Sequence, residues 1–253
     1  MNLVVPIKLV PDLVEELIVN DEGTAIDPGC VRLLINEFDD YAIEQAILLK
    51  EQNGGSVTII APDRENVDDV LYAAAAKGAE RLIKLSGDWD AVDNRALASV
   101  FANVIKSLPA DVILTGVQAH IDLDGAVGPQ LAEKLGLPYV GYVAGVTGVD
   151  GKLIARKEYP GGAAAEMIVR LPAVLGIQAA SKPPRYVPIS KIRQTMKTAK
   201  IEACPAPELV NAGTPLTLRL FKPQAPTHAQ MIDGDENEIA EKLITIFKEN
   251  GVL

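Results

Sequence analysis

Short apolar runs alternate with segments of helical spacing through the first 140 residues, and this alternation limits the chain to few folds. The runs lie at residues 3–10, 57–61, 81–85 and 111–114, and each is short enough to be a buried strand. Such repeated alternation predicts right-handed βαβ units, in which parallel strands form one sheet with helices on both faces. The expected fold class is therefore α/β, with a Rossmann-like, mostly parallel sheet.

Three helices are expected between these strands, and a fourth after the last of them. Each begins at polar or acidic residues and ends close to a glycine or a proline, as helix boundaries usually do. Asp90 or Asp93 is expected to cap the third helix. The expected bounds are residues 36–53, 67–77, 90 or 93 to about 108, and about 122 to 135.

After Pro138 the pattern changes to strands joined by turns. Three consecutive antiparallel strands are expected to form a β-hairpin insertion, and a fourth, strongly apolar strand should return to the sheet. The expected strands cover residues 139–148, 152–159, 165–171 and 171–177.

The C-terminal part carries too many prolines for a compact core of its own. A proline-rich segment leads into a basic helix at residues 190–200, and five prolines lie between Cys204 and His228. An amphipathic helix is expected over residues 236–250, and an extended arm that ends in such a helix usually packs against a partner subunit. We therefore expect a Rossmann-like nucleotide-binding domain (1–180), a partner-recognition loop and helix (181–200) and an extended C-terminal arm (201–253).

Composition excludes several classes of function. A net charge of −10 and an aromatic content of 4% argue against a surface that binds nucleic acid. No apolar run approaches the roughly 20 residues that span a bilayer, and the first residues carry no basic region of a secretory or transit peptide. Two cysteines far apart, Cys30 and Cys204, form no disulfide framework. We expect a protein of the cytoplasm that is not embedded in a membrane.

The stretch from Asp111 to Pro129 is the candidate ligand site. It passes from an apolar run through a glycine turn at Thr115 and Gly116 into a segment of helical spacing. Such a strand–turn–helix unit aims backbone N–H groups and the positive end of a helix dipole at an anion. It also lies at the carboxyl edge of the sheet, where open α/β sheets bind ligands. An ordinary strand–helix connection with acidic caps is the alternative.

Three residues of this stretch can each have more than one role. His120 contacts a ligand or is an incidental loop residue. Asp122 and Asp124 are paired carboxylates, metal ligands or caps, and caps are the most common of these roles. Neither the Walker loop nor the Gly-x-Gly-x-x-Gly fingerprint is present. Since no pattern for a nucleophile, a metal or an acid–base pair stands out, we assign no catalytic residue and no metal ligand.

A second candidate feature is a cluster of positive charge near residues 182–200. Its members lie on an otherwise acidic chain, next to prolines and the apolar Val187 and Ile189. A solvated helix face is one reading, and a docking segment is the other. The cluster consists of Lys182, Arg185, Lys191, Arg193, Lys197 and Lys200.

Several segments together resemble the β subunit of electron transfer flavoprotein. They occur in the same order and spacing over about 200 residues. They are Val-Val-Pro-Ile-Lys-Leu-Val-Pro-Asp (4–12), Asn-Glu-Phe-Asp-Asp-Tyr-Ala-Ile-Glu-Gln-Ala-Ile-Leu-Leu-Lys (36–50), Ala-Ala-Lys-Gly-Ala (75–79), Gly-Val-Gln-Ala (116–119) with Gly-Pro (128–129), and Pro-Arg-Tyr-Val-Pro-Ile (184–189).

The resemblance implies an adenine nucleotide hydrolase-like domain that forms a heterodimer with a flavin-carrying α subunit. The expected cofactors are FAD, bound with the α subunit, and AMP or a second FAD in this chain. The chain would be an electron carrier without substrate chemistry of its own, and would accept electrons from flavin dehydrogenases such as acyl-CoA dehydrogenases. A universal-stress-type regulatory protein that binds adenine nucleotide is the alternative.

The resemblance also implies two sets of residues, one for the nucleotide and one for docking. Gly116 and Gly128 would allow the ligand to approach the backbone closely. Ala126 and Val127 replace polar side chains of the family, which leaves AMP and a second FAD both open as occupants. The nucleotide set is Pro6, Lys8, Asn36, Glu37, Phe38, Asp39, Ala61, Gly116, Val117, Gln118, Ala119, His120, Ile121, Asp122, Leu123, Asp124, Gly125, Ala126 and Val127, and the docking set is Arg185, Tyr186, Ile189, Lys191 and Lys197.

Overall fold

The computed structural model confirms the α/β fold class. It describes residues 1–27, 29, 31–89, 92–122, 124–149, 152–207, 217–223, 229 and 231–253. Within this part of the chain, nine strands form one sheet in the order β11-β5-β4-β1-β6-β10-β7-β8-β9. The strands are β1 (Asn2–Pro6), β4 (Ser56–Pro62), β5 (Arg81–Ser86), β6 (Val112–Gly116), β7 (Tyr139–Val149), β8 (Lys152–Glu158), β9 (Ala164–Val169), β10 (Ala173–Ile177) and β11 (Ile201–Pro205).

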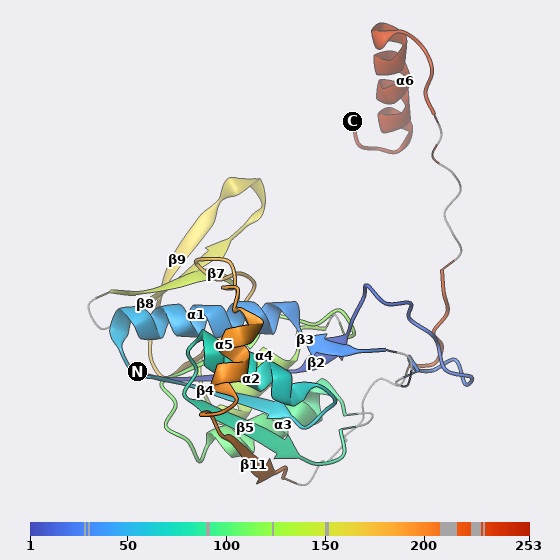
Figure 1. Ribbon diagram of the computed structural model, residues 1–253. Helices are drawn as coiled ribbons and strands as arrows, with labels where there is room; N and C mark the ends of the chain where they lie inside the picture. Colours follow the sequence, from blue (N-terminus) through green and yellow to red (C-terminus); the bar gives the residue numbers. More distant parts are fainter. Residues whose placement is uncertain are drawn as a thin grey trace.

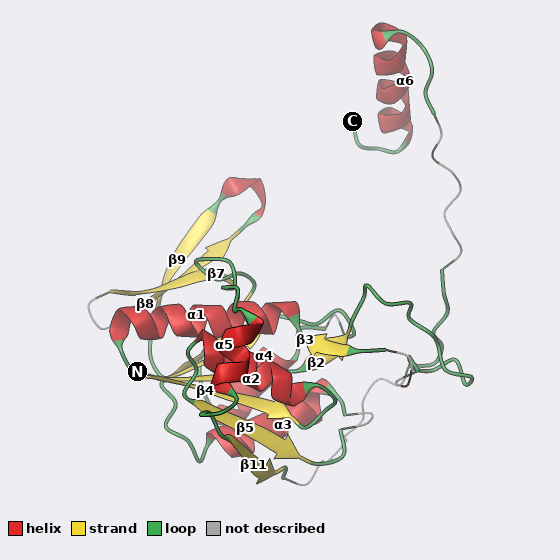
Figure 2. Cartoon of the chain, in the orientation of Figure 1, coloured by secondary structure: helices red, strands yellow, loops and turns green. Residues whose placement is uncertain are grey.

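The strands from β11 to β7 in this order pair in parallel, and β8 and β9 continue the sheet antiparallel as the expected hairpin. Figure 2 shows one helix apart from the sheet, the other long helices beside its parallel part, and β8 and β9 projecting beyond it. The helices are α1 (Glu37–Asn53), α2 (Val67–Lys77), α3 (Asn94–Ile105), α4 (Val127–Leu135), α5 (Ile189–Thr195) and α6 (Glu236–Glu249).

Alternate residues of the central strands enter two separate cores, as the period of a strand requires. In β1, Leu3 and Val5 pack with α1 and α2, whereas Val4 packs with α3 and α4. The same division continues in β6, where Val112 belongs to the first core and Ile113 to the second. The central strands are therefore buried on both faces, which explains their continuous apolar runs.

The first apolar run, which was expected to form one strand, is divided near Lys8, the charged residue that interrupts it. The chain leaves β1 at Ile7, and the N–H of Lys8 donates to the side chain of Asp39 rather than to a neighbouring strand. Leu9–Pro11 then forms a separate strand, β2, which pairs antiparallel with β3 (Leu33–Ile35). A short two-stranded sheet thus stands beside the carboxyl end of β1.

Three further expectations on the boundaries are wrong. α4 begins at Val127 rather than near Asp122, because other donors bind the Asp122 carboxylate and it caps no helix. α3 ends at Ile105, and α5 already ends at Thr195. The side chain of Asp93 does cap α3, and Asp90 lies outside the described residues.

The C-terminal arm begins as a strand of the sheet. β11 pairs in parallel with β5 at one edge, and Arg81 forms hydrogen bonds to Glu202 across the pair at 2.8–3.1 Å. Further along the chain, the N–H of Leu220 donates to the carbonyl oxygen of Gly23 at 2.7 Å, and Lys222 pairs with Glu16 at 2.8 Å. Figure 1 shows α6 apart from the sheet. No residue of α6 is buried. Among the described helices, none is long and apolar enough to cross a membrane.

Candidate functional site

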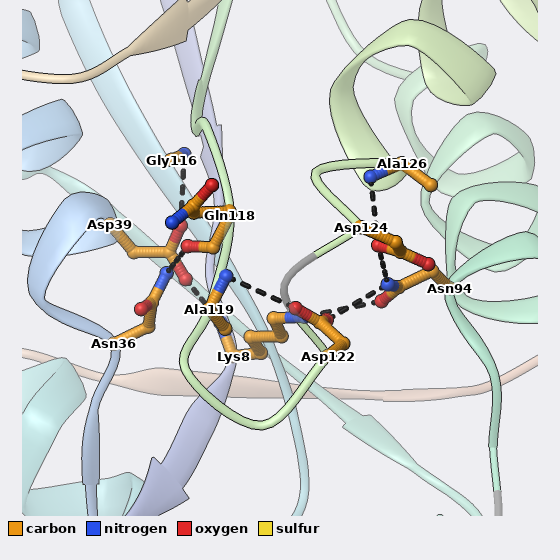
Figure 3. A network of polar contacts seen from close by, with 10 residues as sticks. All are labelled: Lys8, Asn36, Asp39, Asn94, Gly116, Gln118, Ala119, Asp122, Asp124 and Ala126. Atoms are coloured by element: carbon orange, nitrogen blue, oxygen red, sulfur yellow. Dashed lines mark hydrogen bonds and ion pairs between the residues drawn. The ribbon is translucent and has the colours of Figure 1, made fainter. Parts of the chain in front are cut away.

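A small cleft lies at the carboxyl ends of β1 and β6, where the sequence placed the ligand site. The first residues of α1, α3 and α4 surround it, so parts of the chain far apart in sequence meet there (Figure 3). This position is the usual ligand site of an open α/β sheet. Its lining is Pro6, Ile7, Lys8, Asn36, Asp39, Asn94, Leu97, Phe101, Thr115, Gly116, Val117, Gln118, Asp122, Gly125, Ala126 and Val127.

Asp39 joins the two strand ends that form the floor of the cleft. Its carboxylate accepts the N–H of Lys8 and the N–H of Gly116, both at 2.9 Å. Burial raises the pKa of Asp39 to about 6, and the bonds from Lys8 and Gly116 oppose this shift. One buried side chain in the first turn of α1 thus fixes the loops after β1 and β6 relative to each other.

Asn36 makes a second connection between α1 and the loop after β6. The side chain is 2% exposed, and its Nδ2 donates to the carbonyl oxygen of Gln118 at 2.9 Å. It makes no capping bond to its own helix. The sequence Asn-Glu-Phe-Asp therefore begins α1 with two side chains that hold the ligand loop rather than the helix.

Lys8 provides the positive charge among the described lining residues. Its ammonium group pairs with Asp122 and donates to Oδ1 of Asn94 at 3.1 Å. Asn94 in turn donates to Asp122 at 2.8 Å and to Asp124 at 2.6 Å (Figure 3). These contacts tie the loop after β6 to β1 and to the start of α3.

The backbone of the same loop is also organised by its aspartates. Asp122 accepts the N–H of Ala119 at 3.1 Å, and Asp124 accepts the N–H of Ala126 at 3.0 Å. Both carboxylates therefore stabilise the loop. In the described part of the chain, no group of three or more histidine, cysteine or acidic side chains is arranged to bind a metal ion.

Thr115 is the least satisfied polar group of the cleft. Its side chain is 1% exposed, and its Oγ1 has no hydrogen-bond partner among the described residues. The hydroxyl lies against Gly128 in the first turn of α4, where a Cβ on the glycine would approach it to 2.8 Å. No side chain caps α4. A buried free hydroxyl beside the positive end of a helix suits a polar or anionic ligand group.

The structure brings most of the expected nucleotide residues together. Among those outside the lining, Ala61 is fully buried in the core, and the His120 ring contacts the carbonyl oxygen of Pro11 at 3.0 Å. Leu123 lies outside the described residues. Expected residues that do not line the cleft are Glu37, Phe38, Ala61, Ala119, His120, Ile121 and Asp124. Lining residues that were not in the expected nucleotide set are Ile7, Asn94, Leu97, Phe101 and Thr115.

The two glycines Gly116 and Gly128 are also constrained by packing inside the chain. A Cβ at Gly116 would lie 2.5 Å from the Asp39 carboxylate, and one at Gly128 would lie 2.9 Å from the Tyr139 ring. Both glycines are therefore required by packing within the chain itself. The sequence did not reveal Asn94 as a site residue, although it follows β5 at the same edge of the sheet. Only the fold brings the start of α3 beside the loop after β6.

The expected docking residues lie before α5, on it and just after it. Tyr186 and Ile189 are 84% and 65% exposed, and Lys191 and Lys197 are also exposed. Arg185 differs from these four, because its guanidinium pairs with two glutamates of α1.

Comparisons with known proteins agree with this architecture. The family model of the electron transfer flavoprotein domain matches residues 31–209. The chain is 38% identical to an electron transfer flavoprotein subunit beta of Clostridium acetobutylicum, over 76% of this chain and 74% of the relative. It is 29% identical to the subunit of that name from Methylophilus methylotrophus, over 98% of both chains.

A third relative is named as part of a larger complex. It is the Caffeyl-CoA reductase-Etf complex subunit CarD of Acetobacterium woodii, which is 31% identical over the full length of both chains. These matches do not favour a regulatory protein of the universal-stress type. The chain therefore belongs to the electron transfer flavoprotein family and is similar to its β subunits.

Proposed function

We propose that this chain forms a heterodimer with a flavin-carrying α subunit and holds an adenine nucleotide in the cleft described above. The unpartnered Thr115 hydroxyl beside the start of α4 carries this proposal, because a buried hydroxyl without a partner is costly unless a ligand satisfies it. The nucleotide is AMP or the adenosine part of a second FAD.

The residues of the cleft fit such a ligand in chemical type. Lys8 supplies a cation, Asn94 and Thr115 supply polar groups, and Leu97 and Phe101 supply apolar surface for a base. The Lys8 charge is shared with Asp122, and Ala126 and Val127 offer no polar side chain. Recognition of a phosphate would therefore depend mainly on backbone N–H groups and on the start of α4.

The role of the subunit is to carry electrons without chemistry on a substrate. A bound flavin supplies the redox chemistry by accepting and releasing electrons. The chain contributes a scaffold for the nucleotide and a surface on which a donor docks. We propose flavin dehydrogenases, such as acyl-CoA dehydrogenases, as donors, and the exposed Ile189 with Tyr186, Lys191 and Lys197 as the surface that meets them.

The C-terminal arm is proposed to pack on the α subunit. The apolar residues Leu243, Ile244, Ile246 and Phe247 of α6 are between 36% and 45% exposed, and a partner would cover them. This retains the division into a nucleotide-binding domain (1–180), a recognition segment (181–200) and an arm (201–253).

With two cysteines in 253 residues, we place the heterodimer in the cytoplasm.

Coexpression with the α subunit tests the proposal. We expect a yellow heterodimer, and after denaturation either one FAD and one AMP or two FAD per heterodimer, as measured by absorbance and chromatography. Thr115→Val keeps the shape of the side chain and should lower nucleotide content without lowering the amount of heterodimer. A colourless complex, or a folded chain that releases no adenine nucleotide, would contradict the proposal.

A further inference from the structure

The buried polar side chains are concentrated on one helix. Among the described residues, those that are buried are Asn36, Asp39, Glu44, Gln45 and Thr115, and four of these five belong to α1 or its N-cap. Asn36 and Asp39 serve the cleft. Glu44 and Gln45 lie further along the same helix and hold a different part of the chain.

Gln45 fixes the beginning of the recognition segment. Its Oε1 accepts the N–H and the hydroxyl of Ser181, at 2.9 and 3.1 Å, and the N–H of Val146 at 3.2 Å. Its Nε2 donates to the carbonyl oxygen of Val146 at 2.8 Å. One fully buried amide thus joins α1, β7 and the segment that follows β10.

Glu44 fixes the same segment four residues later. Its carboxylate accepts the backbone N–H of Arg185 at 3.0 Å and the guanidinium Nε at 2.9 Å. The Glu44 side chain is 2% exposed, whereas Glu51, which pairs with the same guanidinium at 2.6 Å, is 52% exposed. A buried carboxylate is costly without its partner, so the Glu44 pair holds the segment more firmly than the Glu51 pair.

These attachments leave the exposed residues of the segment little freedom. Ser181 and Arg185 are both bound to α1, and prolines at 183, 184 and 188 restrict the backbone between them and α5. Tyr186 lies next to the bound Arg185, and Ile189 begins α5. The side chains that face solvent are therefore presented from a segment whose conformation α1 sets.

We propose that Glu44 and Arg185 are positioning residues for the docking of a donor dehydrogenase. Arg185 acts inward, by fixing the segment, and not as a charge that meets the partner. The proposal rests on the docking role proposed above, and preorganisation is its physical basis, since a segment already in its bound conformation loses less entropy on association. It explains why one cation of this cluster faces its own subunit while its neighbours face solvent.

The test uses the complete heterodimer with a short-chain acyl-CoA dehydrogenase as electron donor. Glu44→Gln removes the buried charge at constant size, and Glu51→Gln makes the same change on the exposed partner as the matched control. We expect Glu44→Gln to raise amide hydrogen exchange in residues 181–189, at the hydrogen-bonded N–H groups of Ser181 and Arg185, at least about tenfold. Glu51→Gln should raise it less than about threefold. The KM for the dehydrogenase should rise with Glu44→Gln while kcat and flavin content stay the same.

Several outcomes would overturn the inference. Unchanged exchange in residues 181–189, or an equal rise throughout α1 and the sheet, would make Glu44 a general structural residue. If Glu44→Gln does not fold, Arg185→Lys replaces it as the test. This variant keeps the positive charge but loses the two-nitrogen guanidinium contact, and it must show the same local rise in amide exchange. A local rise in exchange with an unaltered KM would also refute positioning. Ile189→Ala tests the docking surface itself. If this surface does not contact the dehydrogenase, Ile189→Ala leaves the KM unchanged.

Discussion

Replacement of Asp39 by asparagine should change how the stability of the protein depends on pH. The carboxyl group is buried and its pKa is raised from 3.8 to about 6. Because the folded state holds this proton more tightly than the unfolded state, the contribution of Asp39 is most favourable below pH 3.8. It is lost as the pH rises through 6. The difference of about two pH units between the two pKa values corresponds to roughly 3 kcal/mol in the free energy of unfolding. About half of this contribution is lost between pH 5 and 8.

Asp39→Asn removes this titration, so the comparison of the two proteins isolates it. The variant loses one acceptor for the N–H groups of Lys8 and Gly116, and it is expected to be less stable than the wild type at pH 5. This deficit should shrink as the pH rises, because only the wild type bears the cost of a buried carboxylate. The difference in free energy of unfolding between the wild type and Asp39→Asn is expected to change by about 1.4 kcal/mol from pH 5 to pH 8.

Urea unfolding of the heterodimer at fixed protein concentration measures this difference, since dimer stability depends on concentration. Glu37→Gln removes an exposed carboxyl two residues earlier and is the matched control. A constant difference between wild type and Asp39→Asn from pH 5 to pH 8 would refute the reasoning, and so would a deficit that grows with pH. Nucleotide content measured on the same samples would show whether the hydrogen bonds of Asp39 to Lys8 and Gly116 also support ligand binding.

Three other perturbations test separate parts of the structure. Ile189→Ala should weaken docking of the dehydrogenase by about 2 kcal/mol, roughly thirtyfold in affinity, with melting temperature and flavin absorbance unchanged; a lower melting temperature instead would assign Ile189 to the fold. Gly116→Ala places a Cβ 2.5 Å from Asp39 and should cost about 1–3 kcal/mol in urea unfolding, so an unaltered midpoint would contradict the packing argument. Amide exchange of α6 should be fast in the isolated chain and slow in the heterodimer, and equal protection in both would mean that the arm needs no partner.

The sequence by itself determined the fold class and the edge of the sheet that carries the site. Periodicity is a local property, so strands such as β4 and β5 and the helix α2 could be predicted within a residue or two of their observed bounds. Since parallel strands share their carboxyl edge, the loops after β1 and β6 had to lie on the same edge of the sheet. The resemblance to the family added the expected residues of these loops.

The tertiary structure alone decided which side chains act together. Asn94 reaches the cleft because α3 lies beside the loop after β6, and Asp122 binds Lys8 instead of capping a helix. β11 joins the sheet because β5 offers it an open edge, and Arg185 turns inward because Glu44 is buried beneath it. Contacts of this kind span from 28 to 141 residues of sequence. No local pattern encodes them, because the partner of a buried charge is chosen by the packing around it.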